Sequence, residues 1–133
     1  MDTKVTTILV VDDDHAIRTL VAAFLEDAGY TVLVATDGVE GVSVFRQRQS
    51  DIALLITDVM MPNMNGFDFA DCVLELDSQL PVIFISGNIQ DADRGHGCIA
   101  KPFTPAAVVS RVRQALNTPP HQPQSQRRAA YSS

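Results

Sequence analysis

The sequence predicts an α/β fold, a doubly wound parallel sheet of five strands with helices on both faces. Its length of 133 residues fits one domain and excludes two full ones. Short, continuous apolar runs rich in Val and Ile are typical of strands that are covered on both faces. These runs alternate with segments of helical periodicity, which favours the doubly wound arrangement because each crossover must cover one face of the sheet. The five runs are Ile8–Val11, Val32–Ala35, Ile52–Ile56, Val82–Ile85 and Cys98–Ala100.

The helices are predicted from apolar residues that recur on one helical face. The first is the clearest, because its apolar residues follow the i, i+3, i+4, i+7, i+8, i+11 spacing and Gly29 follows as a stop. The second extends from about Gly38 to Gln49, the third includes Ala70, and the last opens at Pro105, a residue favoured in a first helical turn. The apolar face of the first helix is Ile17, Leu20, Val21, Phe24, Leu25 and Ala28, and that of the last is Val108, Val109, Val112 and Leu116.

Composition divides the chain into two regions. Residues 1–117 contain all of the predicted strands and helices, and we expect them to form the domain. Residues 118–133 are rich in Pro, Gln and Ser and lack apolar periodicity. We therefore expect them to form a disordered tail.

Charge and hydropathy exclude several functional classes. The net charge is −6, which disfavours direct binding to DNA or RNA because the protein repels phosphate backbones. The apolar runs are far shorter than the roughly 18 to 20 residues of a membrane helix, so we expect no membrane insertion. Residues 1–7 lack the apolar region of a signal peptide, and we expect a cytoplasmic protein.

Polar residues follow the predicted strands at the points where the strands end. Ligands of open α/β sheets bind outside the carboxyl ends of the strands, so we expect these residues to converge at one edge. Adjacent carboxylates repel one another unless a cation or a proton neutralises them, and oxygen ligands without His or Cys favour Mg²⁺. The residues are Asp12, Asp13 and Asp14 after the first run, Thr57 and Asp58 after the third, Ser86 and Gly87 after the fourth, and Lys101 after the fifth.

Each of these residues also has a simpler interpretation. We expect Asp14 to cap the first helix by accepting amide hydrogen bonds. Taken singly, Asp58 is consistent with a turn aspartate, Ser86 with a plain turn and Lys101 with a solvated lysine. Taken together, in this order along the chain, these residues indicate a reactive site. Beside a metal ion, the Asp58 carboxylate is able to attack a phosphoryl group while Lys101 and Ser86 hold the phosphoryl oxygens.

The ordered set resembles the receiver domain of two-component response regulators, particularly the small stand-alone type of chemotaxis systems. The resemblance covers residues 5–117 and depends on four separated motifs in the expected order at the ends of strands. The motifs are Ile8-Leu9-Val10-Val11-Asp12-Asp13, Leu55-Ile56-Thr57-Asp58-Val59-Met60-Met61-Pro62-Asn63-Met64-Asn65-Gly66, Phe84-Ile85-Ser86-Gly87 and Lys101-Pro102-Phe103. It implies the flavodoxin-like strand order 2-1-3-4-5 and a cis peptide bond between Lys101 and Pro102.

The resemblance also implies a metal site and a phosphorylation site. Asp58 is then the phospho-acceptor. Mg²⁺ is bound by Asp13, Asp58 and the backbone carbonyl of Met60, and Asp12 acts through a coordinated water.

The resemblance also implies roles for Ser86 and Lys101, and the sequence differs from the family pattern at two points near them. Ser86 is at the Ser/Thr position that reorients toward the phosphoryl group, and Lys101 is at the position of the lysine that pairs with the acyl phosphate. Lys101 follows Ser86 by only 15 positions, so we expect the fourth helix of the fold to be short or irregular. Cys98 stands where the family typically has a Tyr or Phe that swings inward on activation. We instead expect phosphorylation to order the segment Asn88–Gly97.

The leading functional hypothesis is a receiver that accepts a phosphoryl group from a histidine kinase or a His phosphotransfer protein. It would catalyse its own phosphorylation and slow dephosphorylation without being a conventional enzyme. Because residues 118–133 are too few to form an output domain, we expect signalling through protein contact or phosphorelay. A second hypothesis keeps the fold as a constitutive binding module whose Asp pocket only holds Mg²⁺. A phosphohydrolase is disfavoured because Met60 occupies the position of its second aspartate and no cap insertion is present.

Overall fold

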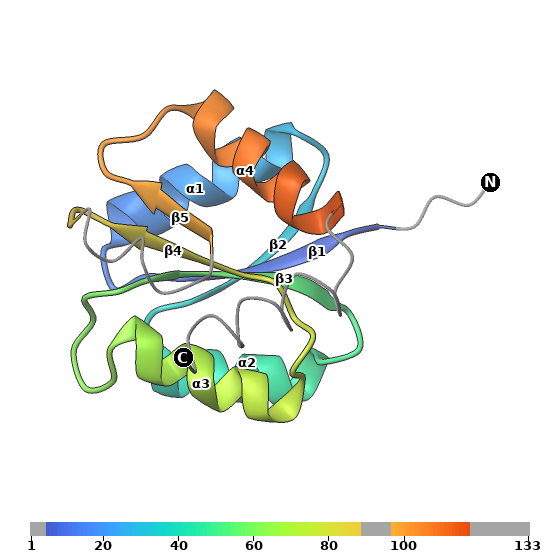
Figure 1. Ribbon diagram of the computed structural model, residues 1–133, viewed down its shortest axis with the longest axis vertical. Coiled ribbons are helices and arrows are strands. Elements are labelled where there is room, and N and C mark those ends of the chain that lie inside the picture. The colour runs from blue at the N-terminus through green and yellow to red at the C-terminus, as the bar shows by residue number, and fades with distance from the viewer. Residues whose placement is uncertain (1–4, 89–96, 118–133) are drawn as a thin grey trace, which may run out of the picture.

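The computed structural model describes residues 5–88 and 97–117. Strands and helices alternate along residues 5–88, as the sequence predicts, and residues 97–117 form a strand followed by a helix (Figure 1). The strands are β1 (Thr7–Val11), β2 (Thr31–Ala35), β3 (Ile52–Asp58), β4 (Val82–Ser86) and β5 (Gly97–Ala100). The helices are α1 (His15–Asp27), α2 (Gly38–Arg48), α3 (Gly66–Leu76) and α4 (Pro105–Asn117).

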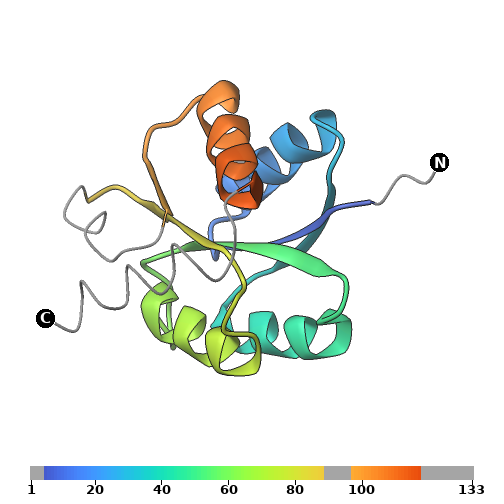
Figure 2. The ribbon, with the colours of Figure 1, turned by 45° about the vertical axis from the view of Figure 1, so that its right-hand side comes forward.

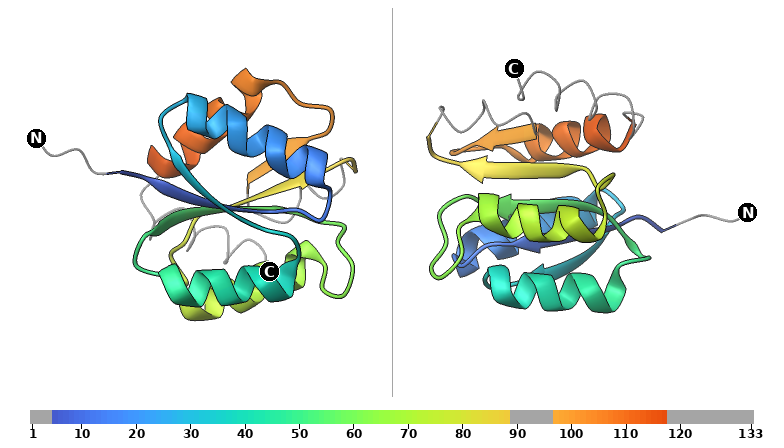
Figure 3. Two further views of the ribbon diagram at one scale, coloured as in Figure 1. Left: turned by 180° about the vertical axis from the view of Figure 1, so that it is seen from behind. Right: turned by 60° about the horizontal axis from the view of Figure 1, so that its bottom comes forward.

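The strands form one parallel sheet in the order β2-β1-β3-β4-β5. Helices α1 and α4 cover one face of this sheet, and α2 and α3 cover the other (Figures 1 and 3). The predicted flavodoxin-like, doubly wound fold is therefore confirmed. Because all five strands are parallel, their carboxyl ends lie at the same edge of the sheet. The sheet is twisted (Figure 2).

The hydrophobic core has two parts, one on each face of the sheet. Successive residues of a strand point to opposite faces, so β1 contributes alternate side chains to the two parts. The part beneath α2 and α3 includes Leu9, Val11, Phe45 and Phe69, and the part beneath α1 and α4 includes Ile8, Val10, Leu25 and Val108. All of these side chains are fully buried. Burying a large apolar side chain contributes roughly 1.5 to 3 kcal/mol, which makes this alternation the main determinant of the register of β1.

Two apolar residues that the sequence pattern places in the core are exposed. Leu20 belongs to the predicted apolar face of the first helix, yet it is 43% exposed. Val34 of the second predicted strand is 46% exposed. Both residues lie at the β2 edge of the sheet: among the described residues no strand pairs with the outer side of β2, and α1 contacts this edge strand.

Some expectations concern residues outside the described part of the chain. The expected short or irregular helix lies between β4 and β5, and so does the segment Asn88–Gly97 that we expect phosphorylation to order. Both expectations concern residues 89–96, which the structure does not describe; the helix labelled α4 is the one that follows β5. The disordered tail concerns residues 118–133, which also lie outside it. Among the described helices, none combines the length and the apolar character needed to cross a bilayer.

Candidate functional site

Three carboxylates meet at the carboxyl edge of the sheet. Asp12 and Asp13 directly follow β1, and Asp58 is the last residue of the neighbouring strand β3. One oxygen of each carboxylate lies within 4.8 Å of an oxygen of the other two. The structure therefore brings together the acidic side chains that the sequence predicts at this edge.

Burial makes two of these carboxylates costly to ionise. Asp12 is fully buried and Asp58 is 5% exposed, whereas Asp13 is exposed. Burial raises the pKa of Asp12 to about 6, although the hydrogen bond from the Asp14 amide opposes this shift. Burial also raises the pKa of Asp58, and the positive charge of Lys101 opposes that shift. A bound cation would favour the ionised form of both carboxylates.

The donor atoms of the cluster fit a hard divalent cation. The three carboxylates supply oxygen ligands only, which Mg²⁺ prefers. Oδ1 of Asp12 accepts a hydrogen bond from the Asp14 backbone amide at 2.9 Å. Oδ2 of Asp12 is buried and has no hydrogen-bond partner among the described residues, an arrangement that is costly unless a cation or a metal-bound water satisfies the oxygen. The exposure of Asp13 leaves the cluster open to solvent, which suits an ion that keeps several of its waters.

Lys101 and Ser86 lie at the same edge of the sheet. Nζ of Lys101 is 3.2 Å from Oδ1 of Asp58, and the two groups form an ion pair. The backbone N–H of Lys101 donates to the Ser86 carbonyl at 2.9 Å, and the Lys101–Pro102 peptide bond is cis, as the resemblance implies. The Ser86 hydroxyl accepts from the Asn88 N–H at 2.9 Å and donates to the Asn88 carbonyl at 3.2 Å. Its hydroxyl is thus engaged in the turn that follows β4.

The loop after β3 is held against the backbone of Asp58. The Gly66 N–H donates to the Val59 carbonyl at 2.8 Å, and a Cβ at Gly66 would overlap the Asp58 carbonyl oxygen. Glycine therefore permits the close approach of α3 to the end of β3. The Thr57 hydroxyl donates to the same Asp58 carbonyl at 2.9 Å. The side chain of Met60 is 78% exposed, and the role of its carbonyl as a metal ligand stays a prediction.

The loop after β1 contains one contact that sequence reasoning missed. Asp14 caps α1 as expected, because its Oδ1 accepts from the amides of Ala16 at 2.9 Å and Ile17 at 3.3 Å. In addition, Nη1 of Arg18 donates to the Asp12 carbonyl at 2.7 Å. The residue pattern carries no signal for this contact, because the contact depends on the conformation of the Arg18 side chain.

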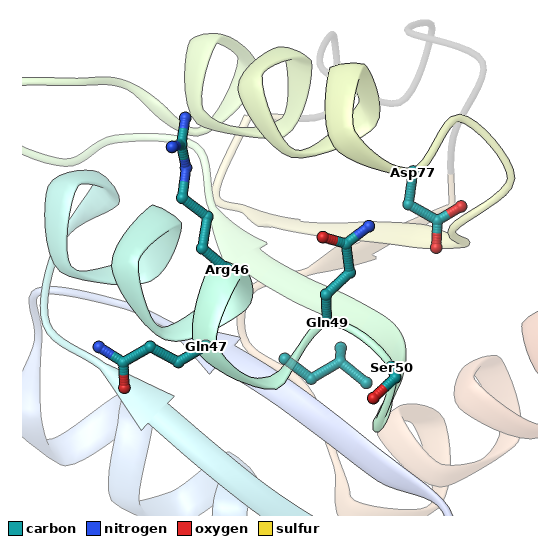
Figure 4. A pocket seen from close by; sticks show the side chains of 6 residues that line it. Arg46, Gln47, Gln49, Ser50 and Asp77 are labelled. Carbon is teal, nitrogen blue, oxygen red and sulfur yellow. The ribbon is translucent and has the colours of Figure 1, made fainter.

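A separate surface pocket lies where α2 and α3 end and β3 begins (Figure 4). The side-chain amide of Gln49 donates to the Leu76 carbonyl at 3.0 Å and so connects the two helices. The lining residues are Arg46, Gln47, Gln49, Ser50, Ile52 and Asp77. None of the predicted site residues is among them, so this pocket is unconnected with the carboxylate cluster.

The raised pKa of Asp12 predicts how stability depends on pH. Between about pH 4 and pH 6, metal-free folded protein retains a proton on Asp12 that the unfolded chain has released. Stability that depends on this proton is therefore lost as pH rises through about 6. We expect the free energy of unfolding, measured by urea denaturation without Mg²⁺, to fall between pH 5 and pH 7 more in the wild type than in Asp12→Asn. Parallel pH profiles for the two proteins would contradict the prediction.

Residues 8–113 match the family model of the response regulator receiver domain. The chain belongs to this family. Receiver domains act in two-component systems, and phosphorylation and Mg²⁺ binding at an acidic pocket are general to the family. In this receiver the acidic cluster consists of Asp12, Asp13 and Asp58.

Individual relatives agree with the assignment. The receiver is similar in structure to the chemotaxis protein CheY4 of Vibrio cholerae, with a TM-score of 0.78, 29% sequence identity and coverage of 84% of this chain and 99% of that one. It is 36% identical over 115 residues to the transcriptional regulatory protein YcbL of Bacillus subtilis, covering 81% of this chain and 50% of that protein. It is 35% identical over 123 residues to the DNA-binding response regulator MtrA of Mycobacterium tuberculosis, covering 87% and 53%.

The expectation of no direct DNA binding is wrong. Among the relatives, MtrA is a DNA-binding response regulator and YcbL is a transcriptional regulatory protein. The charge argument fails because the receiver spans about half the length of these relatives. The net charge of −6 on this chain therefore carries no information about the other half of such proteins.

Proposed function

We propose that Asp58 accepts a phosphoryl group from a phosphohistidine of a histidine kinase or a His phosphotransfer protein. The observation that carries this proposal is the position of the Asp58 carboxylate, which is buried beside two other carboxylates and 3.2 Å from the Lys101 ammonium. In the transfer, a carboxylate oxygen of Asp58 forms a bond to phosphorus, and the phosphorus–nitrogen bond of the donor breaks. The electron pair of that bond remains on the donor imidazole, and the product is an acyl phosphate.

The same proposal gives the acidic cluster its role. Asp13, Asp58 and the Met60 carbonyl would hold Mg²⁺, and Asp12 would act through a coordinated water. When bound, the ion neutralises negative charge that would otherwise repel an incoming phosphoryl group. The buried Oδ2 of Asp12, which lacks a partner among the described residues, and the solvent-exposed carboxylate of Asp13 support this assignment.

Lys101 and Ser86 would hold the transferred group. The side chain of Lys101 is 31% exposed, so its ammonium is able to move from the Asp58 oxygen to a phosphoryl oxygen while it keeps some contact with water. Ser86 must first exchange its hydrogen bonds with the Asn88 backbone. Its hydroxyl would then donate to a second phosphoryl oxygen, which links the phosphorylated state to the turn after β4.

Intact-mass measurement tests the proposal directly. The protein is incubated with acetyl phosphate and Mg²⁺, and we expect a mass gain of one phosphoryl group that is largely lost when the metal is chelated. A protein that binds Mg²⁺ but gains no mass from any small phosphodonor would contradict the proposal. The constitutive binding module would then be the better account of the same pocket.

Mg²⁺ is expected to stabilise the unmodified protein, because the ion binds the folded state and relieves carboxylate repulsion. At a concentration 100-fold above the Kd, the gain is about 2.7 kcal/mol. Thermal melts with and without Mg²⁺ measure this effect, and Asp13→Ala should lose most of it. Asp71→Ala, which removes an exposed carboxylate of α3, serves as the matched control and should respond like the wild type. An unchanged wild-type melting temperature at millimolar Mg²⁺ would show that the cluster is not a metal site.

A further inference from the structure

The side chain of Arg18 contacts the loop that carries two of the acidic residues. Its Nη1 donates to the Asp12 carbonyl at 2.7 Å, and its Nη2 lies 3.0 Å from Nδ1 of His15. Because a guanidinium has donors only, His15 accepts this second hydrogen bond through Nδ1. The backbone N–H of Arg18 also donates to the Asp14 carbonyl at 2.9 Å. Arg18 thus connects the start of α1 to the end of β1.

The contact fixes a peptide plane within the cluster. The Asp12 carbonyl and the Asp13 amide belong to one planar peptide unit, so the hydrogen bond from Arg18 restrains the direction in which the chain enters Asp13. On the other side of Asp12, its backbone N–H donates to the Ala35 carbonyl at 3.2 Å. The Asp12 side chain is restrained as well, because Oδ1 accepts from the Asp14 amide. The backbone of Asp12 is therefore hydrogen-bonded at both its N–H and its carbonyl. Arg18 makes the bond to the carbonyl, which is the group next to Asp13.

Asp13 depends on this backbone restraint more than its neighbour does. Its carboxylate is exposed, whereas that of Asp12 is fully buried in the packed edge of the sheet. An exposed carboxylate gains little from packing, so its distance from Asp58 depends on how firmly the loop is held.

We propose that Arg18 is a positioning residue for the metal site: it orients the Asp12–Asp13 peptide and so sets the distance between the Asp13 and Asp58 carboxylates. This inference rests on the proposed function, in which Asp13 and Asp58 hold Mg²⁺. Groups that orient metal ligands from outside the ligand set typically change metal affinity by about 10- to 100-fold when they are removed.

Charge and positioning predict opposite effects for the loss of Arg18. As a nearby cation, Arg18 repels Mg²⁺, so on charge alone its replacement by a neutral residue should tighten metal binding. As a positioning residue, it should weaken metal binding when replaced. Arg18→Met keeps much of the apolar length of the side chain and removes both the charge and the donors. The sign of the change in Kd therefore separates the two roles.

The experiment compares Mg²⁺ binding by isothermal titration calorimetry in the wild type, Arg18→Met, Arg18→Lys and Arg113→Met. We expect Arg18→Met to raise the Kd about tenfold. Arg18→Lys retains the charge and one set of donors without the planar fork, and it should recover part of the affinity. Arg113 is exposed near the end of α4, so Arg113→Met is a matched control for the loss of one positive charge and should leave the Kd nearly unchanged. An equal or lower Kd for Arg18→Met would overturn the inference.

A second measurement needs no metal. Hydrogen exchange of the Asp14 amide, which donates to Oδ1 of Asp12, should be faster in Arg18→Met than in the wild type if the loop is less firmly held. Unchanged exchange in Arg18→Met would also count against the inference.

The controls separate this inference from the proposed function. One outcome is that the wild type and Arg18→Met bind Mg²⁺ equally well while Asp13→Ala does not bind it. In that case the inference about Arg18 fails and the metal site stands. If the wild type does not bind Mg²⁺, the metal site fails and the inference fails with it. A loss of fold stability alone would lower the melting temperature of Arg18→Met and leave the Kd of the folded protein unchanged, which contradicts positioning.

Discussion

Asp58→Asn is expected to abolish phosphorylation of the receiver while leaving it folded. The amide has the shape of the carboxylate but cannot form an acyl phosphate, so intact mass after treatment with acetyl phosphate and Mg²⁺ should show no phosphoryl gain. Because burial raises the pKa of Asp58, a neutral amide in its place removes a buried charge. We therefore expect the metal-free melting temperature of the variant to be at least as high as that of the wild type.

The control for this experiment is Asp71→Asn. Asp71 is exposed on α3, outside the cluster, and its replacement should leave the stoichiometry of labelling at the wild-type value. Full labelling of Asp58→Asn would mean that another residue is the nucleophile. The neighbouring carboxylates Asp12 and Asp13 would be the first to test in that case.

Gly66→Ala is expected to cause the largest loss of stability from a single methyl group. A Cβ at Gly66 would overlap the Asp58 carbonyl oxygen and lie 2.9 Å from the Cα of Val59. Both neighbours are backbone atoms, so no flexible side chain is available to move aside. Overpacking of this kind costs about 3 kcal/mol, at the upper end of the usual range, and should lower the Tm by roughly 10 °C.

Gly87→Ala is the matched control for this prediction. It adds the same methyl group after β4, where no atom of the described residues, apart from the two chain neighbours, lies within 4 Å of the new Cβ. With space available, the change should alter the free energy of unfolding by less than about 1 kcal/mol, because its main effect is on the unfolded chain. Equal thermal stability of Gly66→Ala and Gly87→Ala would contradict the close approach of α3 to β3.

The strands were predictable from the sequence because most of them are covered on both faces. The run Ile8–Val11 contains no polar residue, and all four of its side chains are fully buried. The exposure of Leu20 and Val34 was not predictable, because periodicity identifies an apolar face and does not reveal which strand lies at the edge. That information comes from the strand order, which only the resemblance supplied.

The site was predictable where it depends on chain topology. Asp12, Asp13 and Asp58 lie at strand ends that share one edge, so their placement at this edge follows from the fold class, and their close contact follows from the pairing of β1 with β3. Contacts between a side chain and a backbone carbonyl carry no such signature. The hydrogen bond from Arg18 to Asp12 depends on a side-chain conformation, and the distance between Gly66 and Asp58 depends on the path of a loop, so neither could be predicted from the residue pattern.

The two-sided core has a consequence for how the protein unfolds. Alternate residues of β1 contribute to opposite parts of the core, so each part shares the same strands as one of its walls. If α1 and α4 detached, Ile8 and Val10 would face water, and the strand that positions Leu9 and Val11 would lose half of its support. Neither half of the core is able to melt alone at low cost, and unfolding is therefore cooperative across the sheet. A ligand bound at the carboxyl edge would thus stabilise the helices of both faces together.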